Sequence, residues 1–413
     1  MKVFLIPPPA LPVPAVKGGA VETLITHLLE ENELCGELEL VCVSVPDREA
    51  EQRAESYRHA TVHYVPTVQG VRRKVWGPMC GQMRRMGQPA PLDPWYEKVR
   101  KLVMEERPDL VIVEGGDLTE SAAIARMVGR ERTWAHLHMQ FKANRQLSDM
   151  YGSVLSISRF VADQWQSMEP CRIHLLPNCV DVKKFTHLPA EEGEGARLRR
   201  ELGFAEDDFV VLYCGRICEE KGVHRLVEAM VKIDDPKVKL LIIGSPFFAA
   251  KDDSPFFERM RTEAEPLRQA GRIQFTGYLH NDRLPAYYRL ADLACFPAIW
   301  EEPAGIVAIE AMACGCPIVA TASGGMGEYL TGSGAALVSR DEDWHYEGSV
   351  PVPGVEPLED QLARIIVELK MDPEHRERMA QAGIERAKKF SRQAYYRNFL
   401  AALHSVELED DVL

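Results

Sequence analysis

The chain has 413 residues, which is too long for a single hydrophobic core and suits two domains of roughly 200 residues each. Hydrophobic residues make up 46% of the sequence and charged residues 27%, and this composition excludes fibrous, disordered and mini-protein classes. The 49 basic and 62 acidic residues give a net charge of −13, so we expect no nucleic-acid partner, because such binding depends on neutralising phosphates.

The first half of the chain alternates short apolar segments with amphipathic ones, a pattern typical of βαβ units around a parallel sheet. Each apolar run suits a strand whose two faces are both buried. We predict strands at residues 2–6, 38–45, 110–114, 133–138 and 154–158, and a helix at residues 20–33.

The second half repeats the alternation, with predicted strands at residues 209–214, 238–243, 272–275, 293–296 and 317–321. Between the halves, residues 186–195 are polar, acidic and contain Pro and Gly, as inter-domain linkers usually do. The predicted fold class is therefore α/β, with one parallel sheet in a domain at residues 1–185 and another in a domain at residues 200–390.

We expect neither a membrane-spanning helix nor a secretory signal. The longest nearly apolar stretch, residues 304–322, is interrupted by Glu310 and broken at Gly315 and Pro317, and the apolar run at residues 1–6 is too short for a signal peptide. The ten cysteines lack the spacing of a zinc knuckle or redox pair, so we interpret them as reduced thiols in a cytoplasmic protein.

One segment departs from the acidic character of the chain. Residues 69–101 contain eight basic and two acidic side chains, a local charge of +6. A solvated charged surface is one interpretation, and a patch at residues 72–101 that makes a peripheral contact with an anionic membrane or holds a phosphate-bearing acceptor is the alternative. Gly77, Pro78 and Gly81 interrupt the segment, so the sequence does not establish an amphipathic helix there.

Ligands of open α/β sheets bind at the carboxyl ends of the strands, so the loops there are the candidate sites. After the first strand, Gly18 and Gly19 precede a helix whose free amides can receive a phosphate, and a tight turn is the alternative. After the first strand of the second half come Gly215 and Arg216, then Lys221. Two cations beside one loop suit a diphosphate, although each alone is an ordinary surface charge.

Two glutamates that follow the strand at residues 293–296 are the strongest candidates. Glu302 lies in the loop before a predicted helix, and Glu310 lies one to two turns inside it. Because the surroundings of Glu310 are apolar, an unpaired carboxylate there is costly and we expect a partner for it. Ribose hydroxyls, an arginine and a backbone amide are the open alternatives. Gly305 lets backbone approach a ligand at the start of the helix.

Two further polar groups are open to a metal interpretation that we do not favour. His136 and His138 share one face of a strand, but the residues that follow supply no third ligand before Asp149, so we expect hydrogen-bonding histidines and no metal. The acidic residues 341–343 have the spacing of a metal-nucleotide pair, but their polar surroundings favour a solvated turn.

These motifs together resemble the retaining nucleotide-sugar glycosyltransferases of family 4, which have the GT-B architecture of two facing Rossmann-like domains with an inter-domain cleft. The resemblance is dense over residues 209–329 and thinner, but present, in the first half. The matching positions are Gly18, Gly19, His138, Ser156, Ser158, Arg159, Leu176, Pro177, Asn178, Val180, Asp181, Phe185, Gly215, Arg216, Lys221, Gly222, Gly244, Phe275, Thr276, Gly277, Glu302, Pro303, Gly305, Glu310, Ala311, Met312, Ala313, Gly315, Pro317, Gly324, Gly325 and Glu328.

The resemblance implies a role for individual residues. Arg216 and Lys221 would hold the donor diphosphate, Glu302 the hydroxyls of the transferred sugar, Glu310 the ribose, and His138 the sugar near its reacting carbon. It makes His138, Arg216, Lys221 and Glu302 the predicted catalytic residues. The predicted donor-binding residues are Gly18, Gly19, Gly215, Gly244, Gly277, Tyr278, Leu279, Pro303, Ala304, Gly305, Ile306 and Glu310. It also implies that a last helix, at residues 391–405, packs back on the first domain.

The implied function is retaining transfer of a sugar from a nucleotide sugar, UDP-glucose or UDP-N-acetylglucosamine, to a hydroxyl of a carbohydrate or lipid-linked acceptor in bacterial envelope, surface-polysaccharide or glycolipid synthesis. No cofactor and no metal are expected, because arginine, lysine and amide groups would neutralise the departing diphosphate. The alternatives are a catalytically silent, surface-associated protein of the same fold and a sugar-nucleotide epimerase or hydrolase. Ala304 stands where many members carry an aromatic residue, and His-Leu-His-Met surrounds His138 in place of a more common His-Asp or His-Asn.

Overall fold

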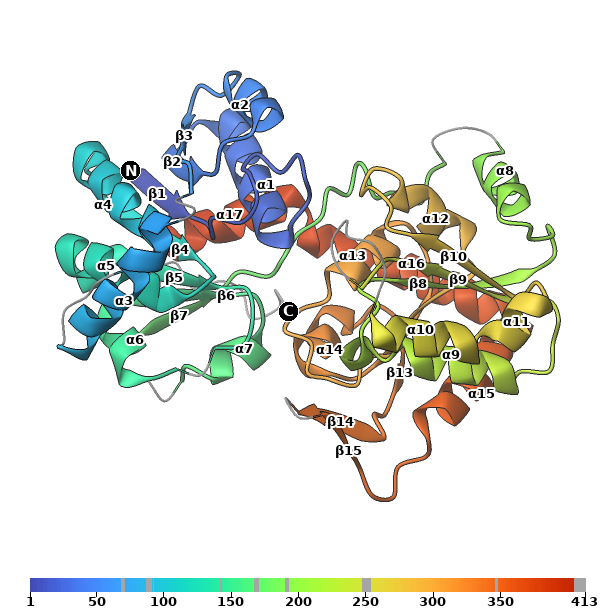
Figure 1. The fold of residues 1–413 in the computed structure, drawn as a ribbon. Coiled ribbons are helices and arrows are strands. Elements are labelled where there is room, and N and C mark those ends of the chain that lie inside the picture. The colour runs from blue at the N-terminus through green and yellow to red at the C-terminus, as the bar shows by residue number, and fades with distance from the viewer. Residues whose placement is uncertain are drawn as a thin grey trace. The chain divides into compact units, whose positions relative to one another are not determined.

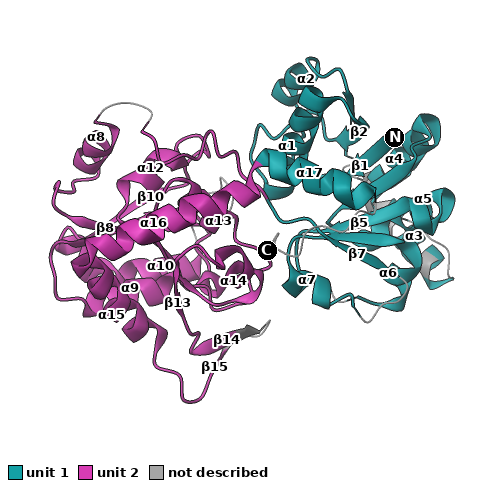
Figure 2. Ribbon diagram, turned by 180° about the vertical axis from the view of Figure 1, so that it is seen from behind, with its two compact units in different colours: residues 1–178, 392–412 teal, residues 179–391, 413 magenta. Residues whose placement is uncertain are grey.

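The computed structural model describes residues 1–67, 71–86, 91, 93–141, 143–166, 171–189, 193–246, 254–345 and 348–404. The chain divides into two compact units (Figure 2). Unit 1 consists of residues 1–178 together with the described residues from Arg392 onward, and unit 2 consists of residues 179–391.

Unit 1 is built on a seven-stranded parallel sheet with the order β3-β2-β1-β4-β5-β6-β7. The central strands are mostly apolar and almost entirely buried, as the sequence pattern requires of a sheet covered on both faces. The strands are β1 (Lys2–Ile6), β2 (Glu39–Ser44), β3 (Ala60–Tyr64), β4 (Leu110–Glu114), β5 (Thr133–Leu137), β6 (Ser153–Ser156) and β7 (Arg172–Leu175).

Helices connect these strands, and Figure 1 shows their places. They are α1 (Ala20–Cys35), α2 (Arg48–Ala54), α3 (Val71–Arg85), α4 (Trp95–Glu106), α5 (Ala122–Val128), α6 (Arg145–Met150), α7 (Arg159–Asp163) and the short 3₁₀ turns η1 (Leu118–Ser121) and η2 (Arg130–Arg132). The last helix of the chain, α17 (Arg392–Leu403), packs on α1. Tyr396 donates a hydrogen bond to Oδ1 of Asn32 over 2.7 Å, and Arg392 pairs with Glu30 at 3.0 Å.

Unit 2 has a six-stranded parallel sheet with the order β10-β9-β8-β11-β12-β13 and a separate antiparallel hairpin, β14 with β15. The strands are β8 (Phe209–Cys214), β9 (Val238–Ile243), β10 (Ile273–Gly277), β11 (Leu293–Phe296), β12 (Ile318–Thr321), β13 (Ala336–Val338), β14 (Glu342–His345) and β15 (Gly348–Pro351). The helices are α8 (Glu194–Glu201), α9 (Val223–Lys232), α10 (Pro255–Glu263), α11 (Glu265–Gln269), α12 (Leu284–Leu290), α13 (Ile306–Ala313), α14 (Gly324–Leu330), α15 (Leu358–Met371), α16 (Pro373–Ala387) and the turns η3 (Glu219–Lys221) and η4 (Lys388–Phe390).

Alternate residues of β8 enter different cores. Val210 and Leu212 pack with apolar residues of α12 and α13, whereas Val211 and Tyr213 pack with those of α9, α10 and α15. This period of two places one hydrophobic core on each face of the sheet, because successive side chains of a strand point to opposite faces. The carboxyl ends of β8 to β12 are therefore held along one edge between two packed layers of helices.

Several expectations from the sequence differ from the structure. Strands β3, β7 and β13 were not predicted, because edge strands are partly exposed and lack a continuous apolar run. The first unit ends at Asn178, seven residues before the predicted domain end at residue 185. Val180 donates its backbone N–H to Phe390 over 2.9 Å, and Phe185 contacts the ring of Tyr288, so this stretch is held by unit 2.

The solvated turn expected at residues 341–343 is wrong, since Glu342 begins strand β14. Arg225 on α9 bonds Glu342 over 2.8 Å and contacts Asp341 at 3.3 Å, while Arg340 pairs with Asp343 at 3.0 Å. The acidic cluster is thus neutralised by arginines, one of which lies more than a hundred residues earlier in the chain.

Candidate functional site

In unit 2, the residues predicted to bind the donor follow β8, β9, β10 and β11, so they lie along the carboxyl edge of the sheet. The strand order changes direction between β8 and β11, which makes this pair the topological switch point of the sheet. Arg216 and Lys221 follow β8, and Glu302 follows β11, so the three charged candidates flank the position where open α/β sheets bind their ligands.

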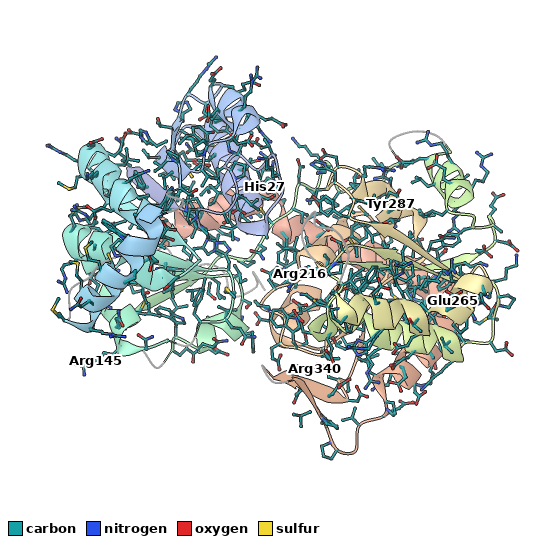
Figure 3. The ribbon with its side chains drawn as sticks, in the orientation of Figure 1. His27, Arg145, Arg216, Glu265, Tyr287 and Arg340 are labelled. Carbon is teal, nitrogen blue, oxygen red and sulfur yellow. The ribbon has the colours of Figure 1, made fainter. Side chains whose placement is uncertain are left out.

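The loop after β8 holds the two predicted cations. The backbone carbonyl of Arg216 accepts a hydrogen bond from the Tyr213 hydroxyl over 2.6 Å, while its guanidinium is half-exposed and lies 3.4 Å from Glu220 (Figure 3). The turn η3 carries Lys221 and ends at Gly222, whose φ of 67° is left-handed. A Cβ at residue 222 would lie 1.8 Å from the carbonyl oxygen of Pro297, so the backbone at Gly222 packs closely against the residue that follows β11.

Lys221 and Glu302 form an ion pair across the switch point. Glu302 is buried, and the ammonium of Lys221 also lies 4.8 Å from the centre of the Trp300 ring. The backbone carbonyl of Glu302 accepts the N–H of Gly325 over 2.7 Å, which ties this loop to the start of α14. Lys221, predicted to hold the diphosphate, and Glu302, predicted to hold the sugar, are therefore direct neighbours.

Glu310 lies on α13 and is buried, and its partner is a tyrosine. The hydroxyl of Tyr288, from α12, donates to Oε2 of Glu310 over 3.0 Å. Burial raises the pKa of Glu310 to about 7, and the Tyr288 hydrogen bond and the charge of Lys184 oppose this only in part. The sequence did not indicate Tyr288. It lies 22 positions before Glu310, and its place among the buried residues of α12 does not distinguish it from an ordinary core residue.

The remaining donor-binding predictions lie in the neighbouring loops. The backbone N–H of Gly244, after β9, donates to the carbonyl of Gly277 at the end of β10 over 3.0 Å, and Tyr278 beside it is exposed. Gly215 directly follows β8, and Gly305 caps the start of α13. Pro303 completes the loop after β11, whereas Leu279, Ala304 and Ile306 pack against the hydrophobic core.

In unit 1, Gly18 and Gly19 precede α1 as predicted, and both have left-handed φ values. A carboxyl group that sequence reasoning missed stands beside them. Oε2 of Glu22 lies 2.1 Å from where a Cβ of residue 19 would be, and burial raises the pKa of Glu22. The amides at the start of α1 thus have a side-chain acid close by, and phosphate binding there stays a prediction.

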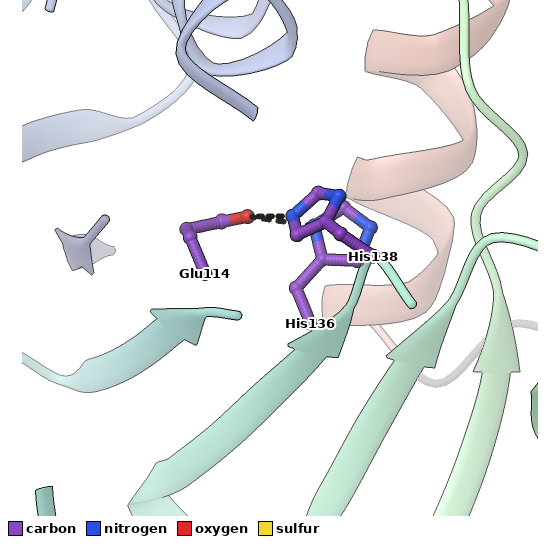
Figure 4. A group of neighbouring side chains, drawn as sticks. All are labelled: Glu114, His136 and His138. Carbon is purple, nitrogen blue, oxygen red and sulfur yellow. Dashed lines mark hydrogen bonds and ion pairs between the residues drawn. The ribbon is translucent and has the colours of Figure 1, made fainter. Parts of the chain in front are cut away.

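His138 belongs to a triad with Glu114 and His136 (Figure 4). Glu114 ends β4 and is the register partner of His136 on β5. Its Oε2 lies 2.7 Å from Nδ1 of His136 and 2.9 Å from Nε2 of His138. Glu114 was not predicted from the sequence, because it lies on the neighbouring strand β4 and precedes the histidines by more than twenty residues.

The electrostatics of this triad favour an ionised carboxylate and a neutral His138. Burial alone would raise the pKa of Glu114, but the Coulombic effect of His136 and the hydrogen bonds with both rings lower it to about 2. Burial and the charge of His136 lower the pKa of His138 to about 4, and Glu114 counteracts this only in part. The carboxylate and two imidazoles are also ligand types that zinc prefers, with their ligand atoms within 4.8 Å of one another.

The basic segment is helical over part of its length, because α3 spans Val71–Arg85 with Pro78 inside it. The side chains of Arg72, Arg73, Lys74 and Arg84 lie outside the described part of the structure. Met79, Met83 and Met86 are exposed at helical spacing along and just after α3. In the part of the chain that the structure describes, no helix has both the length and the apolar character needed to cross a bilayer.

The two parallel sheets with helices on their faces define the GT-B fold of glycosyltransferases. A solved structure of the Anabaena protein HepE in complex with UDP-glucose matches this chain with a TM-score of 0.73. The two proteins are 21% identical, and the match covers 98% of this chain and 99% of the solved one.

Residues 195–386, which lie in unit 2, match the family model of glycosyl transferases group 1. D-inositol 3-phosphate glycosyltransferase of Mycobacteroides abscessus is 32% identical over 48% of this chain and 44% of its own length. The putative glycosyltransferase YtcC of Bacillus subtilis is 25% identical over 82% of this chain and 79% of its own. The chain thus matches less than half the length of the first of these relatives.

Proposed function

We propose that the protein is a retaining glycosyltransferase of family 4 that moves a sugar from a nucleoside diphosphate sugar to a hydroxyl acceptor. The observation that carries the proposal is the grouping of Arg216, Lys221 and Glu302 around the switch point of the unit 2 sheet. Two cations suit a diphosphate, and two buried carboxyls, Glu302 and Glu310, suit the hydroxyls of a sugar and a ribose.

The chemistry assigned to these residues is stabilisation of a leaving group. As the anomeric bond breaks, negative charge grows on the departing diphosphate, and Arg216 and Lys221 neutralise it. Binding the diphosphate draws Lys221 away from Glu302. The freed carboxylate then accepts hydrogen bonds from hydroxyls of the transferred sugar. Retention would follow from displacement on the same face of the sugar, with the departing phosphate helping to deprotonate the acceptor.

We propose a UDP-sugar as the donor, UDP-glucose or UDP-N-acetylglucosamine. The likeness in fold to HepE, whose solved complex contains UDP-glucose, supports this choice. No metal is required in the proposal, because side-chain cations and backbone amides carry the charge of the diphosphate.

A carbohydrate or lipid-linked acceptor, met at the cytoplasmic face of a membrane, completes the proposal. The exposed Met79, Met83 and Met86 near basic residues support a peripheral contact, since apolar and basic side chains together bind anionic lipid surfaces. Sedimentation with vesicles of phosphatidylcholine alone or with phosphatidylserine tests this part. Equal recovery with both kinds of vesicle would contradict an electrostatic membrane contact.

A thermal-shift panel of UDP, GDP, ADP and their sugars tests the donor assignment. A ligand at 100 times its dissociation constant stabilises the folded state by about 2.7 kcal/mol, which is easily detected. We expect a shift with UDP and its sugars that Arg216→Ala and Lys221→Ala each weaken. No shift with any nucleotide would favour a catalytically silent protein, and consumption of the nucleotide sugar without an acceptor would favour an epimerase or hydrolase.

A further inference from the structure

The carboxylate of Glu114 lies within hydrogen-bonding distance of one nitrogen of His138, Nε2. An ionised carboxylate can only accept hydrogen bonds, so Nε2 of His138 must donate the 2.9 Å bond to Oε2 (Figure 4). A neutral imidazole carries one N–H, and the pKa of His138, lowered by burial to about 4, keeps the ring neutral near pH 7. Its Nδ1 is therefore left with a bare lone pair.

We propose that Glu114 is a positioning residue that holds His138 in the Nε2–H tautomer, so that Nδ1 accepts a hydrogen bond from a hydroxyl of the transferred sugar. The inference rests on the proposed function and on the role that the family resemblance implies for His138, which is to contact the transferred sugar. Exposure distinguishes the two histidines, since the side chain of His138 is 9% exposed and that of His136 is 1% exposed. His138 is therefore the more exposed of the two rings of the triad.

His136 and Gly115 also help to keep the His138 ring in place. His136 donates from Nδ1 to the same oxygen of Glu114 over 2.7 Å, and the centres of the two imidazole rings lie 3.9 Å apart. Burial, and after it the neighbouring His136, lower the pKa of His138, so the ring of His138 stays an acceptor. Gly115 allows backbone to lie against the His138 ring, where a Cβ would come within 3.3 Å of Cδ2.

Replacement of Glu114 by glutamine removes the charge and changes the hydrogen-bonding pattern, but it keeps the size and shape of the side chain. The amide of glutamine can donate a hydrogen bond as well as accept one, and a donated bond stabilises the opposite tautomer, in which His138 Nδ1 carries the proton. Nδ1 would then repel the hydroxyl hydrogen that it should accept. We expect Glu114→Gln to lower kcat about 10- to 100-fold, the scale of one charged hydrogen bond lost from a site, and to leave UDP affinity unchanged.

A matched control is available in the same unit. Glu120 is a buried carboxylate just after β4 that accepts the backbone N–H of Asp93 over 2.8 Å and is not part of the triad. We expect Glu120→Gln to leave kcat near the wild-type value, and Glu114→Asp, which keeps the carboxylate, to recover part of the kcat lost in Glu114→Gln.

Nuclear magnetic resonance of ¹⁵N-histidine protein reads the tautomer without an activity assay, with His138 assigned by its loss in His138→Gln. We expect an Nε2–H signal for His138 in the wild type and a shift toward Nδ1–H in Glu114→Gln. A wild-type His138 with Nδ1–H, or a Glu114→Gln enzyme with unchanged kcat, would overturn the proposal. So would inactivation by EDTA that zinc reverses, because the triad would then be a metal centre.

Different results would refute the proposed function and the role of Glu114. Absence of any nucleotide effect in the wild type would refute the proposed function, whereas normal UDP binding with a wrong tautomer would refute only the role of Glu114. If Glu114→Gln does not fold, the wild-type spectrum alone decides, since it needs no substitution at Glu114.

Discussion

The hydroxyl of Tyr288 donates a hydrogen bond to Glu310 across 3.0 Å, inside the hydrophobic core that joins α12 to α13. A single neutral donor compensates a buried carboxylate poorly, and this explains why burial dominates and raises the pKa of Glu310 from 4.5 to about 7. A carboxyl group that changes its charge near neutral pH therefore lies beside the proposed donor site.

The first prediction concerns the pH dependence of stability. Because the pKa of Glu310 is higher in the folded state, its contribution is fully present below pH 4.5 and is lost as pH rises through about 7. Relative to Glu310→Gln, the wild type should lose up to about 3 kcal/mol of unfolding free energy over this range. Chemical denaturation from pH 4.5 to 8 measures the difference.

A matched control for this series is Glu374→Gln, which removes an exposed carboxylate from the first turn of α16. The gap between this control and the wild type is the baseline of the series. A gap between the wild type and Glu310→Gln that varies no more with pH than this baseline would contradict the raised pKa of Glu310.

The second prediction concerns nucleotide binding. If Glu310 accepts hydrogen bonds from two ribose hydroxyls, the ionised form is the one that binds, since only a carboxylate offers acceptors alone. With a pKa of about 7, the ionised fraction rises about tenfold between pH 6 and pH 8, so UDP affinity should rise by a similar factor. Calorimetry at the two pH values measures it, and affinity that falls with pH would rule out this role of Glu310.

The sequence predicted the buried strands well. For the candidate site it indicated residues within single loops, but not their partners from other elements. Strands β1, β4, β8, β9 and β11 have the predicted bounds, because a continuous apolar run leaves no other place for them. Edge strands such as β3 have mixed burial and gave no such signal. Partners that come from another element were also missed, as Tyr288 and Glu114 show, since strand register and helix packing bring them to the site.

The third prediction concerns the ion pair of Lys221 and Glu302. Truncating Lys221 leaves the buried carboxylate of Glu302 without its cation, and such a loss costs about 3 kcal/mol for a fully buried pair, less here because Lys221 is 21% exposed. Lys221→Ala should therefore destabilise the protein more than Lys221→Ala combined with Glu302→Gln. Urea denaturation of the double-mutant cycle measures the coupling, and additive effects would show that the pair contributes nothing.

The fourth prediction concerns Gly222, where the chain turns from η3 into α9. Its φ of 67° and the Pro297 carbonyl oxygen 1.8 Å from the position of a Cβ both exclude a side chain. Gly271 is a matched control, because its φ of 61° is equally left-handed but nothing lies within 4 Å of its Cβ position.

Gly271→Ala should cost only the backbone penalty of about 1 kcal/mol, whereas Gly222→Ala must also push the loop after β8 away from β11. We expect a loss of unfolding free energy at least twice as large for Gly222→Ala, together with weaker UDP binding, because Lys221 is the preceding residue. Similar unfolding curves for the two variants would mean that the loop after β8 can move away from β11 at little cost in free energy. The close approach of these two loops would then not be what holds Lys221 against Glu302.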